Sequence, residues 1–260
     1  MNKTRLIYWS SVALGVLPFP GKRCYFVLGF PKSGTSWTFQ LLSDYLELPR
    51  LKPSKRYWPC FGSCVIKAHR FLPGDSVRKR TIYVVRDGRD VVISYYMSLV
   101  RGEPRNRAAI EKSLGATLAA DRIRDHLPKF LLHCRDNKRA SIPYRDHVFH
   151  ALKRGYSMIR YEDLLENGEE TFAKAVELLL GRPADFDRIR QVLHDNDFKT
   201  RTGRERGVEA KRVFMRKGIA GDWRNHFSRE SAEIFNDYAG DVLVELGYES
   251  DRDWVQSVAA

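Results

Sequence analysis

The chain has 260 residues, 43% of them hydrophobic and 12% aromatic, so it can bury one sizeable core, and its length does not force a division into domains. Its net charge of +13 favours an anionic partner without choosing among a nucleotide, a nucleic acid and an anionic membrane. The sequence has no internal repeat or low-complexity tract, which excludes repeat architectures. We therefore expect a single domain over residues 1–260.

An apolar stretch near the N-terminus runs from Leu6 to Phe19 and is interrupted by two serines and a glycine. It is shorter than the roughly 20 residues that span a bilayer, so we expect no transmembrane span. A signal peptide is the alternative, but no convincing small-x-small cleavage site is present. We interpret residues 1–21 as an N-terminal segment that packs on the domain or rests at an acceptor site, with peripheral membrane contact left open.

Four short apolar runs predict buried strands, because β-branched and aromatic residues dominate them. They are Tyr25–Leu28, Val65–Lys67, Ile82–Val85 and Ser157–Arg160. Apolar residues recur at helical spacing in the segments 37–46, 91–99, 171–180 and 228–246. The third helix stops at Gly181, and the fourth starts at a capping Ser228 and stops at Gly247. The alternation predicts an α/β fold, a three-layer P-loop-like domain with a central parallel sheet flanked by helices.

Polar residues follow each predicted strand at the point where it ends. Lys32 follows the first strand, Lys67 to His69 the second, Arg86 the third and Tyr161 the fourth. In open parallel sheets, ligands bind beyond the carboxyl ends of the strands. We therefore expect the four strand ends to converge on one site.

The first of these turns, Gly29 to Trp37, lies between a strand and an amphipathic helix. Backbone N–H groups and a helix N-terminus at such a turn can hold a phosphate, while Lys32 adds a positive charge and three hydroxyl side chains can add hydrogen bonds. The turn is not a Walker A sequence, because the lysine precedes the second glycine. We call residues 29–37 the phosphate loop.

The phosphate loop resembles the 5′-phosphosulfate loop of the sulfotransferases, of cytosolic and bacterial type, that use 3′-phosphoadenosine 5′-phosphosulfate (PAPS). Two distant segments agree with this resemblance. Residues 84–96, a strand ending in Arg86 and a helix bearing Ser94, resemble the family's 3′-phosphate segment. Residues 216–227, here called the C-terminal loop, resemble its C-terminal nucleotide loop. The three segments occur in the family's order, which makes coincidence a poor explanation.

The resemblance implies a set of nucleotide-binding residues. The phosphate loop would hold the 5′-phosphosulfate through Lys32, Ser33, Gly34, Thr35 and Ser36, with Trp37 near the adenine. The 3′-phosphate would be bound by Arg86, Ser94, Arg216, Lys217 and Gly218, and Tyr161 would contact the nucleotide. Ordinary core packing is nearly as good an interpretation of Trp37 and Tyr161.

The chemical step requires charge stabilisation on the leaving oxygen and a base for the acceptor proton. Lys32 is the candidate for the first role, with Lys67 adding positive charge. His69 is the favoured base, since it matches the histidine of the family's Lys-Thr-His segment. That segment reads Lys67-Ala68-His69 here, and Arg70 also departs from the more apolar residue of related members. The acceptor geometry is therefore open.

Four cysteines without secretory spacing indicate reduced thiols and a cytoplasmic location. Cys60, Cys64 and His69 lack a fourth ligand at finger-like spacing, so we expect no metal site. No carboxylate follows a strand as a magnesium ligand would, which fits a metal-independent reaction.

The sequence therefore predicts a sulfotransferase that moves a sulfuryl group from PAPS to a hydroxyl or amine and releases PAP. The acceptor would be a small molecule, with glycans and lipids as alternatives, and residues 101–150 would form the lid of its cavity. A P-loop-like kinase that uses ATP and magnesium is the second hypothesis. A basic nucleic-acid-binding domain is the third, but no known nucleic-acid-binding motif is present. The sequence does not indicate an oligomeric state.

Overall fold

The computed structural model describes residues 23–51, 62–102, 107–136, 143–210, 213 and 215–258. The chain forms two compact units. The first unit comprises Met1–Val85 and Arg154–Gly203, and the second comprises Arg86–Lys153 and Arg204–Ala260. A single-domain organisation stays a prediction, and the N-terminal segment 1–21 lies outside the described residues.

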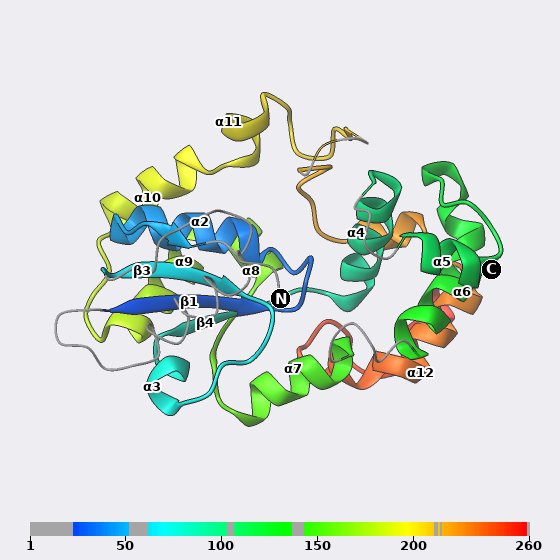
Figure 1. Ribbon diagram of the computed structural model, residues 1–260, viewed down its shortest axis with the longest axis horizontal. Coiled ribbons are helices and arrows are strands. Elements are labelled where there is room, and N and C mark those ends of the chain that lie inside the picture. Colours follow the sequence, from blue (N-terminus) through cyan, green and yellow to red (C-terminus); the bar gives the residue numbers. More distant parts are fainter. Residues whose placement is uncertain are drawn as a thin grey trace. The chain divides into compact units, whose positions relative to one another are not determined.

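The first unit contains a parallel five-stranded sheet with the order β2-β3-β1-β4-β5 (Figure 1). Its strands are β1 (Cys24–Gly29), β2 (Arg50–Leu51), β3 (Cys64–Ala68), β4 (Thr81–Val85) and β5 (Ser157–Arg160). All four predicted strands are confirmed, each within one residue at either end. The edge strand β2 was not predicted, because two residues are too short to show an alternating pattern.

Each face of this sheet buries its own apolar cluster, because successive side chains of a strand point to opposite faces. On one face, Tyr25 and Val27 of β1 pack with residues of the neighbouring strands and of helices α2, α8, α9 and α10. On the other face, Cys24 and Phe26 pack with residues of β2, β3 and α3. The sulfur atoms of Cys24 and Cys64 lie 3.3 Å apart on this second face without forming a disulfide. The central strands β1 and β4 are buried along their whole length and β3 at all but one residue, as expected for parallel strands covered on both faces.

The helices of the first unit are α2 (Thr35–Leu46), α3 (Asp75–Arg78), α8 (Tyr161–Glu166), α9 (Gly168–Leu180), α10 (Phe186–Asp195) and α11 (Phe198–Thr202). The predicted stop of α9 is confirmed, since Gly181 adopts a left-handed φ of 68° there. Asp185 caps α10, and its carboxylate accepts a hydrogen bond from the amide of Arg188.

The second unit is helical in its described part. Its elements are α4 (Gly88–Val100), α5 (Arg107–Leu114), η1 (Ala120–Arg122), α6 (Ile123–Asp136), α7 (Tyr144–Lys153), η2 (Asp222–Asn225), α12 (Arg229–Glu245) and η3 (Asp253–Ser257). The predicted cap of α12 is confirmed, because the Ser228 side chain accepts a hydrogen bond from the amide of Ser231. The core of the second unit contains large buried side chains, among them Tyr96, Phe130 and Phe235.

The strand order places the phosphate loop at a topological switch point. β1 has β3 on one side and β4 on the other (Figure 1). The chain runs from β1 to β2 and β3 on one side and then crosses to β4 on the other, so the strand order reverses at β1. In open α/β sheets a crevice forms beyond the carboxyl ends of the strands at such a point. The phosphate loop follows β1 directly and therefore starts at this position.

Candidate active site

The phosphate loop turns the chain from β1 into α2 through two residues with left-handed backbone. Lys32 has a φ of 74° and Gly34 a φ of 91°. A non-glycine residue in this region is strained, and such strain concentrates at ligand-binding sites. A Cβ atom on Gly34 would lie 2.5 Å from the Cδ2 atom of Tyr161, so this position requires glycine for both backbone and space.

Hydrogen-bond donors of this loop fit an anion. The hydroxyl of Ser33 is buried and has no hydrogen-bond partner among the described residues. Helix α2 starts after Gly34 without a side-chain cap and has no acidic residue in its first turn. A buried unpaired hydroxyl and an uncapped helix N-terminus are both costly, and a bound phosphate would satisfy them together. The loop therefore has the chemistry of a phosphate site.

Lys67 and His69 lie at the carboxyl end of β3, next to the phosphate loop. The Lys67 ammonium donates a 3.0 Å hydrogen bond to the hydroxyl of Ser36. Nδ1 of His69 donates a 2.8 Å hydrogen bond to the backbone oxygen of Gly29, because a carbonyl can only accept. This bond makes Nε2 the ring atom that can take up a proton.

The electrostatic surroundings keep His69 neutral. The pKa of His69 is lowered from 6.5 to about 4, mainly by burial; the hydrogen bond to Gly29 raises it in part, and the positive charges of Lys67 and Lys32 contribute to the lowering. The imidazole is therefore neutral throughout the physiological pH range. A neutral imidazole next to two lysines can accept a proton from a substrate group.

Trp37 and Tyr161 support the phosphate loop from its two sides. Their rings meet edge to face with centroids 5.9 Å apart, and the Trp37 indole N–H donates to the backbone oxygen of Asn196 at 3.0 Å. Tyr161 is buried against Gly34, whereas Trp37 is half-buried. The observed contacts are those of packing residues, and a contact of either ring with adenine stays a prediction.

Arg86 and Ser94 belong to the second unit and lie at the start of α4 and within it. Nη2 of Arg86 donates to a carboxylate oxygen of Asp90 at 3.1 Å and to the backbone oxygen of Ile219 at 3.0 Å. Asp90 and Ser94 are four residues apart, so they share one face of the helix. The structure thus brings two predicted segments, residues 84–96 and the C-terminal loop, into direct contact through Arg86.

The cations of the C-terminal loop are paired with two carboxylates. Asp222 accepts hydrogen bonds from Arg216 and, at 2.7 Å, from Lys217. Glu209 accepts a 3.0 Å hydrogen bond from Arg216 and lies 3.9 Å from the ammonium of Lys217. Burial alone would raise the pKa of Asp222, but hydrogen bonds from His226, Lys217 and Arg216 hold it well below its usual value. Asp222 is therefore ionised whenever the protein is folded.

Sequence reasoning missed both of these carboxylates. Asp222 follows Lys217 by five residues, so its place in the same loop was visible, although a pairing within an irregular loop has no fixed spacing. Glu209 precedes the C-terminal loop, and no sequence motif connects it to Arg216 or Lys217. Gly218, the last predicted residue of this set, accepts a 3.4 Å hydrogen bond from Arg206 through its backbone oxygen.

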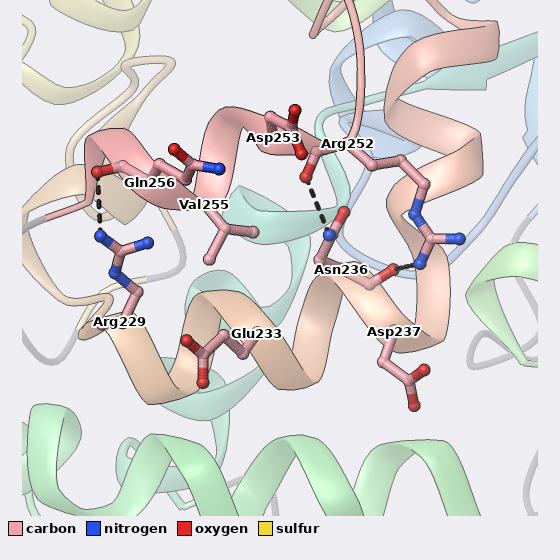
Figure 2. Close-up of a pocket in the computed structure, with 8 residues that line it drawn as sticks. All are labelled: Arg229, Glu233, Asn236, Asp237, Arg252, Asp253, Val255 and Gln256. Atoms are coloured by element: carbon pink, nitrogen blue, oxygen red, sulfur yellow. Dashed lines mark hydrogen bonds between the residues drawn. The ribbon is translucent and has the colours of Figure 1, made fainter.

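Two other cavities in the described part of the chain are not lined by any predicted site residue. Figure 2 shows the first, a polar cavity of about 430 Å³ between α12 and η3, lined by Arg229, Glu233, Asn236, Asp237, Arg252, Asp253, Val255 and Gln256. Several of these side chains bond within the cavity wall, as Arg229 does with the backbone oxygen of Gln256. The second cavity, of about 230 Å³, lies beside Tyr45 and Arg188 in the first unit. Neither cavity belongs to the candidate site.

The described residues contain no group of three or more histidine, cysteine and acidic residues placed to hold a metal ion. Cys60, one of the three residues considered for a metal, lies outside them. None of the helices in these ranges is long and apolar enough to cross a membrane.

The predicted lid region, residues 101–150, contains α5, η1, α6 and most of α7 in its described part. Tyr96 of α4 anchors this region, since its hydroxyl donates to the backbone oxygen of Ala119 at 2.9 Å and lies 2.8 Å from Nδ1 of His126. Phe130 of α6 packs edge to face on the same tyrosine. These helices are therefore part of a packed core, and a role as an acceptor lid stays a prediction.

Comparison with known proteins gives one consistent family. Residues 65–247 match the sulfotransferase domain. The rabbit amine sulfotransferase is 26% identical over 246 residues, which cover 81% of this chain and 77% of that protein.

Solved structures show the same fold. Mouse sulfotransferase SULT7A1 complexed with PAP superimposes with a TM-score of 0.61 at 16% identity, over 96% of this chain and 94% of that one. Retinol dehydratase in complex with androsterone and PAP superimposes with a TM-score of 0.57 at 17% identity, over 91% and 85%. The predicted α/β fold with a central parallel sheet flanked by helices is confirmed.

Proposed function

This chain belongs to the sulfotransferase domain family, and from that premise we propose how its own residues transfer a sulfuryl group from PAPS to a hydroxyl or amine acceptor and release PAP. The observation that carries the proposal is the phosphate loop. It combines a strained turn, a buried hydroxyl without a described partner and an uncapped helix start, directly after the central strand. Each of these features is unfavourable until an anion binds.

Two sets of residues would bind the two ends of the donor nucleotide. Residues 32–36 of the phosphate loop would bind the 5′-phosphosulfate through backbone N–H groups, hydroxyls and the Lys32 ammonium. Arg86, which precedes α4, and Ser94 within α4 would bind the 3′-phosphate together with Arg216, Lys217 and Gly218. When bound, the donor supplies an activated sulfuryl group whose transfer requires in-line positioning and stabilisation of negative charge.

The catalytic roles follow from charge and tautomer. Nε2 of His69 would take the proton of the acceptor, since Nδ1 carries the hydrogen that is donated to Gly29 and the ring is neutral. Lys32 would stabilise the negative charge that develops on the leaving oxygen, and Lys67 would add to it from the end of β3. The hydrogen bond from Lys67 to Ser36 ties this charge to the phosphate loop.

For the acceptor we infer a small molecule that carries a hydroxyl or an amine. Relatives support both chemistries, because one is named an amine sulfotransferase and one structural neighbour contains androsterone. Residues 101–150 would contribute to its cavity, and the cytoplasmic location expected from the spacing of the four cysteines fits such a substrate. A kinase function has no support from any of the similar proteins.

The test is nucleotide selectivity followed by an acceptor screen. We expect PAP to bind more tightly than ATP with magnesium by at least 10-fold in isothermal titration calorimetry, because PAP offers a 3′-phosphate to Arg86. Labelled PAPS is then incubated with panels of small phenols, alcohols and amines, and sulfated products are separated. Tighter binding of ATP with magnesium, with no labelled product, would overturn the proposal.

A further inference from the structure

Asp90 is a buried carboxylate that joins α4 to the C-terminal loop. Its side chain is 0% exposed. It accepts three hydrogen bonds, one from the Arg86 side chain and two from backbone amides of the segment 221–223. The two segments are about 130 residues apart in the sequence, so one side chain fixes their relative placement.

The two oxygen atoms of Asp90 accept hydrogen bonds from different donors. Oδ2 accepts from Nη2 of Arg86 at 3.1 Å and from the amide of Gly221 at 2.8 Å. Oδ1 accepts from the amide of Trp223 at 2.9 Å. The same nitrogen of Arg86 also donates to the backbone oxygen of Ile219. Arg86 and the C-terminal loop are thereby held to one another both directly and through Asp90.

From this arrangement we infer that Asp90 is a positioning residue for recognition of the donor's 3′-phosphate. The inference rests on the proposed function, because it assigns Arg86 and the C-terminal loop to that phosphate. A buried carboxylate with three donors holds its partners in one geometry, so Arg86 does not need to be ordered when the nucleotide binds. Asp90 thus contributes to the preference for a nucleotide with a 3′-phosphate over one without it.

The neighbouring Asp87 provides a matched control. It is also a buried carboxylate at the start of α4, where it caps the helix by accepting from the amide of Arg89 at 2.9 Å. It also accepts from the Arg89 side chain at 2.7 Å, and that guanidinium lies against the Trp223 ring. Loss of its charge therefore disturbs the same helix end and leaves the hydrogen bond from Arg86 to Asp90 in place.

The experiment compares the binding of PAP and of adenosine 5′-phosphate, which lacks the 3′-phosphate, to the full chain. For Asp90→Asn we expect at least a 10-fold loss of affinity for PAP and a change within about twofold for adenosine 5′-phosphate. For Asp87→Asn we expect both affinities to change by the same factor. In an Arg86→Ala background, Asp90→Asn should cost much less PAP affinity, because the main target of its positioning is gone.

The outcomes separate this inference from the proposed function. A wild-type chain that binds PAP and adenosine 5′-phosphate equally would contradict the proposed 3′-phosphate site itself. A wild-type preference for PAP that persists in Asp90→Asn would overturn only the role of Asp90, as would a parallel loss of both affinities. Should Asp90→Asn not fold, Asp90→Glu decides, because it keeps the charge and shifts the carboxylate by one methylene; an unchanged preference in that variant overturns the inference.

Discussion

The phosphate loop of the first unit and the C-terminal loop of the second prepare for an anion in opposite ways. In the phosphate loop the burial of Ser33 and the uncapped start of α2 leave donors that an anion would satisfy. In the C-terminal loop the cationic side chains are already bound to carboxylates, Arg216 to Asp222 and Glu209, and Lys217 to Asp222.

This difference indicates how each loop gains affinity. A donor without a partner in the ligand-free protein forms a new hydrogen bond when the ligand binds, and the whole of that bond contributes to affinity. The same unsatisfied donor lowers the stability of the ligand-free protein. Cations that already have carboxylate partners gain only the difference between the old and the new partner, so they act mainly as selectors of shape and charge. Removal of a single polar group should therefore weaken PAP binding in the phosphate loop and can strengthen it in the C-terminal loop.

The largest effect is expected for the lysine of the phosphate loop. Lys32→Ala should lower kcat by about 10³-fold, because it removes the charge nearest the leaving oxygen. The rate of label transfer from PAPS to an acceptor found in the screen measures this. Lys79→Ala is the control, since Lys79 is 71% exposed and pairs with the exposed Asp75. A Lys32 variant with wild-type kcat would contradict the catalytic role of Lys32 and leave the phosphate loop with a role in binding alone.

The second effect concerns the proposed base. His69→Gln should lower kcat by about 10²-fold and leave PAP binding within about twofold, because the residue acts on the acceptor proton. His194→Gln, at an exposed position next to Asp195, serves as the control and should have wild-type kinetics. Equal losses in kcat and in PAP affinity would assign His69 to nucleotide binding instead.

The pH dependence of folding stability provides a separate test of His69. The pKa of His69 is about 4 in the folded protein and near 6.5 in the unfolded chain, so between these values the unfolded state binds the extra proton. The stabilising contribution is therefore fully present above pH 6.5 and is lost as the pH falls toward 4, by at most about 3 kcal/mol. Thermal melts of wild type and His69→Gln across this range test it, and the variant should show the flatter curve. Parallel curves would show that His69 is not buried in its neutral form.

Smaller effects are expected at Ser33, where a substitution should change stability and PAP affinity in opposite directions. Ser33→Ala removes a buried hydroxyl that has no described partner, so the ligand-free protein should gain about 1 kcal/mol of stability, while PAP affinity falls about 10-fold. Thr38→Val is the matched control, because Thr38 is another buried hydroxyl without a described partner, one turn further into α2. It should gain stability and keep its affinity. Loss of stability in Ser33→Ala would contradict the unsatisfied state of this hydroxyl.

The smallest effect is an increase in affinity. Glu209→Gln should tighten PAP binding by about threefold, because it removes the carboxylate that competes with a phosphate for Arg216 and Lys217. Glu230→Gln makes the same change in net charge at an exposed position in α12 and corrects for long-range attraction. Weaker binding in Glu209→Gln would show instead that this carboxylate supports Arg216.

The sequence predicted the parts of the molecule that depend on local pattern. The four long strands follow from runs of apolar residues, and the stop of α9 at Gly181 follows from the conformational freedom of glycine. The phosphate loop was visible because its residues are consecutive. Helix α6 was not predicted although its apolar residues are regularly spaced, because Pro128 lies inside it and ordinarily indicates a break.

The remaining features arise from contacts between distant segments. The left-handed backbone of Lys32 and the burial of Ser33 depend on how Tyr161 and α2 pack around the loop. The bonds of Asp90 to the backbone amides of the segment 221–223 required the fold to bring the two segments together. Such pairings have no fixed sequence spacing, so a single sequence does not reveal them.

The hydrogen bond between His69 and the carbonyl of Gly29 has a mechanical consequence. Gly29 is the last residue of β1 and also the first residue of the phosphate loop, whereas His69 directly follows β3. The neighbouring strands β1 and β3 are therefore linked at their carboxyl ends by a side chain in addition to their backbone pairing. A substitution that shifts β1 relative to β3 should thus alter the position of the imidazole and the start of the phosphate loop together.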